Sequence, residues 1–154
     1  PKGDLLGALV IDAGGRGTGQ STPLFSTPSE AATAASITIR GHASVDVRNT
    51  EPGAIEVAGR LQLSGALAID DSSTLTVHEV RAESLTLTGA SVLTHPAATL
   101  ARVSSLLLDV GALSVDSTSR IDTSARGYLG GRSGGNGDQG RKVSGCHGIA
   151  SVSA

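Results

Sequence analysis

The acidic residues at the ends of short apolar stretches are the best candidates for chemistry in this chain. Asp12, Asp46, Asp70 and Asp116 each close a six-residue phrase of the form G-A-L-x-V-D. If the phrases stack, their carboxylates form a column, and like charges held one strand spacing apart repel each other. A calcium ion would relieve this repulsion, because hard cations bind clustered carboxylate and carbonyl oxygens. The alternative is that each Asp accepts backbone hydrogen bonds in a turn, where water and nearby arginines screen its charge.

The phrase recurs along the whole chain. Its six copies are GALVID at 7–12, GHASVD at 41–46, GALAID at 65–70, GASVLT at 89–94, GALSVD at 111–116 and GIASVS at 148–153. The spacing of their glycines indicates a basic unit of about 22–24 residues, with the first and last intervals longer than the others. A period of this size is typical of arrays in which each unit buries its apolar face on its neighbours.

Between the phrases, apolar residues keep a period of two, which predicts strands with one buried and one solvated face. From 37 to 69 they fall on odd positions: Ile37, Ile39, Val45, Val47, Ile55, Val57, Leu61, Leu63, Leu67 and Ile69. Superposing each unit on the next by their glycines would stack Ile37 on Leu61 and Leu61 on Leu85. The glycines of the phrase would then share one corner of each unit, where the absence of a Cβ lets the chain turn.

Short apolar pairs, about three in each unit, favour an all-β parallel β-helix (β-solenoid) of about six coils. We expect residues 1–154 to form a single segment with two glycine-rich loop insertions, at about 13–35 and 123–147. Neither end offers a capping unit with a polar outer face. Flanking coils or end-to-end copies of the chain are therefore the expected partners.

Composition argues against several functions. The net charge is −2 and there are only two aromatic residues, so a nucleic-acid site is not expected. No apolar run reaches the roughly 18 residues of a membrane span. The four histidines fall at unmatched positions, which indicates scattered surface histidines and not a zinc site. They are His42, His78, His95 and His147.

The segment IDTSARGYLGGRSGG at 121–135 resembles parts of very large secreted or surface proteins of bacteria. Those adhesin- or fibre-like proteins are built on right-handed parallel β-helices with a pectin-lyase-like fold. The resemblance implies a right-handed helix that acts as a non-catalytic stalk, adhesin or fibre segment at the cell surface or outside the cell. Its glycine-rich loops would contact surface carbohydrate or protein.

The same fold occurs in pectate-lyase-like enzymes, which bind calcium through acids on the outer wall beside a basic residue. The alternative function is therefore a fragment of a polysaccharide-active enzyme that uses calcium. The candidate basic partners are Arg81, Arg120 and Arg126.

Cys146 is the only cysteine, so the chain has no internal disulfide. It lies two positions before Gly148, as Ile39 lies before Gly41 and Leu87 before Gly89. This position predicts that Cys146 points into the core and is not a reactive thiol.

Overall fold

A computed structural model describes residues 7–17, 19–26, 31–49, 59–98 and 104–126. Within them all regular structure is β, and no helix long and apolar enough to cross a membrane occurs there. The strands are β1 (Ala8–Asp12), β2 (Thr22–Ser26), β3 (Ala32–Ala34), β4 (Ser36–Arg40), β5 (Ser44–Asn49), β6 (Arg60–Leu63), β7 (Ala66–Ile69), β8 (Thr74–Thr76), β9 (Glu79–Leu87), β10 (Val92–Thr94), β11 (Leu107–Val115) and β12 (Arg120–Asp122).

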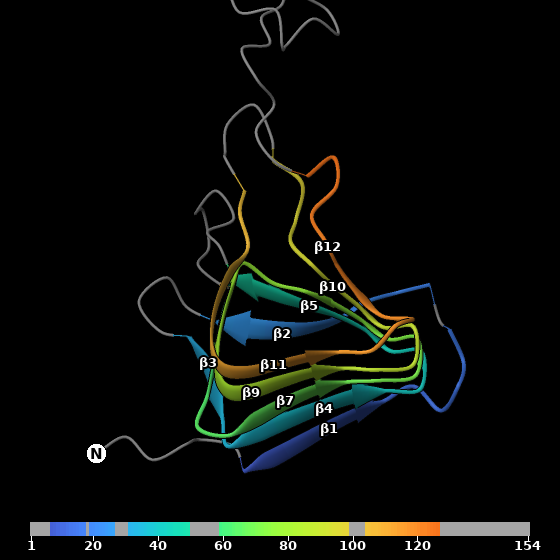
Figure 1. Cartoon of the computed structure of the whole chain (residues 1–154), viewed down its shortest axis with the longest axis horizontal. Helices are drawn as coiled ribbons and strands as arrows, with labels where there is room; N and C mark the ends of the chain where they lie inside the picture. The colour runs from blue at the N-terminus through green and yellow to red at the C-terminus, as the bar shows by residue number, and fades with distance from the viewer. Residues whose placement is uncertain (1–6, 18, 27–30, 50–58, 99–103, 127–154) are drawn as a thin grey trace, which may run out of the picture.

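Every strand pairing in these residues is parallel. The first sheet has the order β1-β4-β7-β9-β6-β3, with β11 also on β9, and the second has the order β12-β10-β8-β5-β2. Figure 1 shows β1, β4, β7, β9 and β11 lying one above the other, with the second sheet across from them. Parallel neighbours require a long return connection. Here that connection runs through the other sheet.

We call one such circuit of the chain a pass. Pass 1 comprises β1 to β3, and pass 2 comprises β4 to β6. The long strands β9 and β11 each belong to two passes, because the first part of β9 pairs with β6 and its second part pairs with β7. Pass 3 therefore runs from β7 to the first part of β9, pass 4 from its second part to the first part of β11, and pass 5 from there through β12.

The register between passes differs from the uniform shift of one repeat unit that the sequence predicts. Ile37 pairs with Leu67 and not with Leu61, and Leu67 pairs in turn with Leu85 and Leu85 with Leu113. The step from Leu67 to Leu85 is much shorter along the chain than the steps on either side of it. The stacking of aliphatic on aliphatic residues is as expected, but the predicted partners are wrong.

The register prediction was wrong because the glycines of the phrase lie at two different corners. Gly7, Gly65 and Gly111 precede strands of the first sheet, or lie within one, in passes 1, 3 and 5. Gly41 and Gly89 follow first-sheet strands, in passes 2 and 4, with φ of 71° and 64°. Each pass therefore holds one copy of the phrase, but odd and even passes place it differently, and the same placement recurs in every second pass.

The predicted insertion at 13–35 is also wrong in part, because β2 and β3 lie inside it. All residues of β2 pair with β5. The composition of this tract, rich in Ser, Thr, Pro and Ala, does not indicate a strand. Irregular chain remains at 13–17 and 19–21, between β1 and β2. Of the predicted insertion at 123–147, residues 127–147 lie outside the described part of the chain.

The predicted alternation of buried and exposed residues is confirmed in the described part of the chain, whereas Ile55 and Val57 lie outside it. Gln62 is exposed, whereas Leu61 and Leu63 on either side of it are buried. The aliphatic core consists of Ala34, Ile37, Ile39, Ala43, Val45, Val47, Leu61, Leu63, Leu67, Ile69, Leu75, Val77, Val80, Leu85, Leu87 and Leu93.

A row of small polar residues, where the chain passes from the first sheet to the second, was not predicted. Ser73 and Ser91 are fully buried there. The Ala43 amide donates to Ser73 Oγ at 3.2 Å, and the Ser91 amide donates to Ser119 Oγ at 3.1 Å. These hydroxyls satisfy backbone groups that would otherwise be buried without a partner.

Candidate functional site

The acids at the end of the first strand of each odd pass belong to a polar column on the outside of the first sheet. Asp12 pairs with Arg40 across β1 and β4. The backbone ladder continues upward, because the amides of Asp70, Thr88 and Asp116 donate to carbonyls of the preceding passes. We call Asp12, Arg40, Asp70, Thr88 and Asp116 the outer column.

In this column Asp12 and Asp70 are each followed by a hydrogen-bond donor in place of another acid. Arg40 Nε donates to Asp12 Oδ2 at 2.8 Å. Thr88 Oγ1 donates to Asp70 Oδ1 at 3.0 Å. The predicted adjacency of carboxylates on neighbouring passes is therefore wrong, since even passes place Arg40 and Thr88 between them. The repulsion that motivated a calcium ion is relieved by the chain itself.

Asp12 and Asp116 also accept backbone hydrogen bonds at the corner. The Gly14 amide donates to Asp12 Oδ1 at 2.8 Å, and this bond, followed by that of Arg40, lowers the pKa of Asp12. Asp116 Oδ2 accepts from the Gly89 amide at 2.8 Å, in the preceding pass. That bond is the main reason that the pKa of Asp116 lies well below its usual value, and Ser119 adds to it.

Asp46 lies apart from the other three acids, in the second sheet. Its neighbours in adjacent strands are Pro23 and Thr76. Its Oδ2 accepts from Arg48 Nε at 2.7 Å. The four predicted ligands therefore occupy two different columns. The spacing of the phrase could not reveal this, because GHASVD ends in the second sheet and GALAID in the first.

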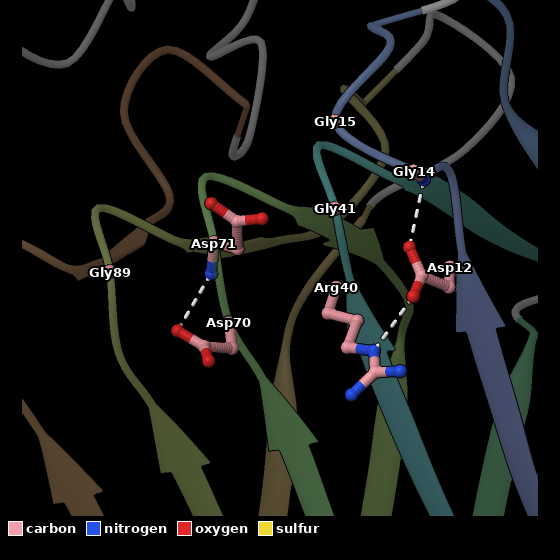
Figure 2. Close-up of a pocket in the computed structure, with 8 residues that line it drawn as sticks. All are labelled: Asp12, Gly14, Gly15, Arg40, Gly41, Asp70, Asp71 and Gly89. Carbon is pink, nitrogen blue, oxygen red and sulfur yellow. Dashed lines mark hydrogen bonds and ion pairs between the residues drawn. The ribbon is translucent and has the colours of Figure 1, made fainter.

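An open depression of about 430 Å³ lies against the lower part of the outer column. It is lined by Asp12, Gly14, Gly15, Arg40, Gly41, Asp70, Asp71 and Gly89. Figure 2 shows Asp12 turned toward Arg40, with the Asp70 carboxylate pointing away from them and the Asp71 carboxylate pointing in a third direction. In the described part of the chain, no three His, Cys, Asp or Glu residues are grouped so that they could hold a metal ion.

The arginines proposed as basic partners contact other groups. Arg81 Nε lies 2.7 Å from Glu79 Oε1, and Arg120 Nε lies 3.4 Å from Asp122 Oδ2. Arg126 Nη1 donates to the His95 carbonyl at 3.1 Å. The arginine of the outer column is Arg40. Its signal in the sequence was its place directly before Gly41, which Thr88 shares before Gly89.

The expectation of surface histidines holds for His42, which is exposed, and is wrong for His78 and His95, which are buried. His95 Nδ1 lies 2.8 Å from the Pro96 carbonyl and 3.1 Å from Ser104 Oγ. The short contact with a carbonyl requires that Nδ1 carry the proton, so this nitrogen cannot also accept the proton of a serine nucleophile. His147 and Cys146 lie outside the described residues.

No protein-family model, curated protein or solved structure matches the chain.

Proposed function

We propose that the chain is a non-catalytic spacer of an extracellular or cell-surface protein, such as a stalk, adhesin or fibre. In this proposal its passes are coils of a right-handed parallel β-solenoid of about six coils. The observation that carries the proposal is the outer column, whose polar groups bond from one pass to the next. The glycine-rich loops would contact surface carbohydrate or protein.

The chemistry of the column supports a structural role. Asp12, Asp70 and Asp116 each bond to an adjacent pass, through Arg40, Thr88 and the Gly89 amide. Acids whose pKa is lowered, as for Asp12 and Asp116, stay ionised at neutral pH and are poor proton donors. Ionised carboxylates of this kind can keep neighbouring strands in register.

A spacer should tolerate a change in its length, provided that odd and even passes still alternate. Duplicating residues 66–111 inserts one odd and one even pass, and we expect a cooperatively folding protein. Small-angle scattering should show it longer by about 10 Å, which is two strand spacings. Duplicating residues 66–83 alone is the control, because it places two Asp70 residues side by side and should destabilise the fold. Equal behaviour of the two insertions would contradict the proposal.

The cellular location needs a separate test in the native host. We expect protease added to intact cells to degrade the protein that contains this chain. Full protection in intact cells, together with cleavage after lysis, would contradict a surface location.

The second candidate is a calcium-dependent enzyme acting on acidic polysaccharide. The depression favours it, because three acids and Arg40 line the same open surface. Calorimetric titration with CaCl₂ and an assay for unsaturated products from polyuronate test this function. Calcium-dependent product formation that is lost in Asp70→Asn and kept in Asp109→Asn would establish the enzyme and overturn the spacer.

A further inference from the structure

Strand β1 lies at the lower end of the first sheet and leaves apolar side chains open there (Figure 1). Among the described residues it pairs only with β4. Val10 is 55% exposed on the outer face of the sheet. On the inner face Leu9 and Ile11 are only partly buried, whereas Ile37 and Ile39, with which they pair, are 2% and 0% exposed. This end of the core is therefore incompletely covered.

The backbone of β1 directs alternate residues toward this free edge. The Ala13 amide donates to the Arg40 carbonyl, so the backbone groups of the odd-numbered residues here face β4. Because these directions alternate along a strand, the amides and carbonyls of Ala8, Val10 and Asp12 face away from β4. These groups can pair with one more strand.

The two strands at this end of the molecule differ in how well their edges are protected. Natural edge strands that stay unpaired are blunted by lysine, proline or a bulge. Strand β2 pairs only with β5 among the described residues, and it contains Pro23, which has no N–H to offer a further strand. Strand β1 contains neither lysine nor proline, and its one charge, on Asp12, is paired with Arg40. The contrast indicates that β1 is the edge open to a partner.

A second copy of the chain matches this edge in the antiparallel orientation. With a two-fold axis through Val10 and perpendicular to the sheet, Val10 lies opposite its own copy and Leu9 lies opposite Ile11. Ala8 then lies opposite Asp12, so apolar residues meet on both faces and no two carboxylates adjoin. The two Val10 residues form a hydrogen-bonded pair, because their backbone groups face the edge.

The parallel, head-to-tail arrangement of two copies fits poorly. In the register of the described passes, β1 of one copy would follow β11 of the other, with Asp12 beside Asp116. Two carboxylates directly opposite each other on adjacent strands repel. The charges of the outer column therefore favour the antiparallel pair.

We infer that β1 is a docking edge for a second copy of this chain, which pairs antiparallel across a two-fold axis at Val10. The contact is isologous, so it closes after two chains. This inference goes beyond the proposed spacer and does not depend on it. If the chain is a spacer, the contact joins two spacers at their first passes and lets them extend in opposite directions.

Cysteine cross-linking of the full chain tests the register. Val10→Cys is combined with Cys146→Ser, which removes the only native cysteine. Hydrogen-bonded residues of antiparallel strands have Cα atoms about 5.5 Å apart, within the range of disulfides. We expect mild oxidation to give disulfide-linked dimers. The matched control is Ala8→Cys on the same strand and face, which lies opposite Asp12 of the copy and should give little dimer.

Sedimentation velocity of the unmodified chain gives a measurement that needs no cysteine, and we expect a dimer. Val10→Lys places two ammonium groups opposite each other and should raise the dissociation constant about tenfold or more. Thr38→Lys, in the same outer row on β4, is the control and should change it by less than about twofold.

Three outcomes would overturn the inference. The first is a monomeric unmodified chain at micromolar concentrations. The second is equal dimer yield from Val10→Cys and Ala8→Cys. The third is a mixture of Val10→Cys and Ser114→Cys chains that cross-links only between the two variants, because Ser114 lies beside Val10 in the head-to-tail arrangement alone.

Discussion

The inner and outer sides of the first sheet differ in what they specify. One residue before the outer column, Ile39, Ile69 and Leu87 are stacked and all 0% exposed. The column positions that follow them hold Arg40, Asp70 and Thr88, three different functional groups. The interior is therefore uniform from pass to pass, while the exterior alternates.

The uniform interior therefore contributes stability, whereas the alternating exterior determines the register between passes. Aliphatic side chains stabilise any stacking that buries them, because the hydrophobic effect is proportional to area and has no direction. A shifted stack of the same strands would bury nearly the same residues. Hydrogen bonds such as that from Arg40 to Asp12 are directional, so they distinguish an odd neighbour from an even one.

The largest expected effect comes from placing a charge in the uniform interior. Ile69→Asp or Leu63→Asp buries a carboxylate without a partner, and we expect a loss of about 3–5 kcal/mol in the free energy of unfolding. Gln62→Asp is the control on the exposed side of β6 and should change it by less than about 0.5 kcal/mol. Urea denaturation measures both. A larger loss for Gln62→Asp would mean that the inner and outer faces are assigned the wrong way round.

At the corner beside the outer column, two neighbouring substitutions should have opposite effects on stability. Gly89→Ala places a Cβ 2.7 Å from Asp70 Oδ1 at a φ of 64°, and we expect a loss of about 1–2 kcal/mol. Its neighbour Ala90 already has a φ of 63°, so Ala90→Gly should stabilise by about 0.5–1 kcal/mol. Urea midpoints that shift in the same direction for both variants would refute this account of the corner.

Reversing the charge of Arg40 would break the alternation of acids and donors in the outer column. Arg40→Glu places three acids on consecutive passes, beside Asp12 and Asp70, and we expect the melting temperature to fall by a few degrees at low ionic strength. Added NaCl should reduce the difference, since exposed charges are screened. Arg16→Glu changes the net charge equally at an exposed site outside the column. A fall of the same size in Arg16→Glu would show that net charge, and not the column, is responsible.

The smallest expected effect is a dependence on pH. Because the pKa of Asp116 is lowered in the folded chain, its stabilisation is present above the unfolded value of 3.8 and is lost as the pH falls toward the folded value. Asp116→Asn should therefore have a lower melting temperature than the native chain at pH 6, and the gap should narrow below pH 4. The control Asp109→Asn alters a largely exposed carboxylate and should show little gap at either pH.

Much of the fold was predictable, because period two in the apolar residues directly reports which side chains face inward. The register was not predictable from the phrase, since GALAID is a strand whereas GASVLT is a corner followed by a strand of the other sheet. Three acids of the outer column, Asp12, Asp70 and Asp116, were among the predicted residues, but Asp71 beside them and the donors between them were missed. Arg40 and Thr88 share a position and no chemical class, so only the pairing of the strands relates them.

Odd and even passes pair in the register that forms the outer column. Thr86 pairs with Ala68 in the structure, whereas a uniform shift of one repeat unit would place it on Gln62. We would oxidise Ala68→Cys/Thr86→Cys and Gln62→Cys/Thr86→Cys, each with Cys146→Ser, and compare disulfide yields under native conditions. We expect a rapid intramolecular disulfide in the first pair and little in the second. A disulfide in the second pair but not in the first would contradict this register.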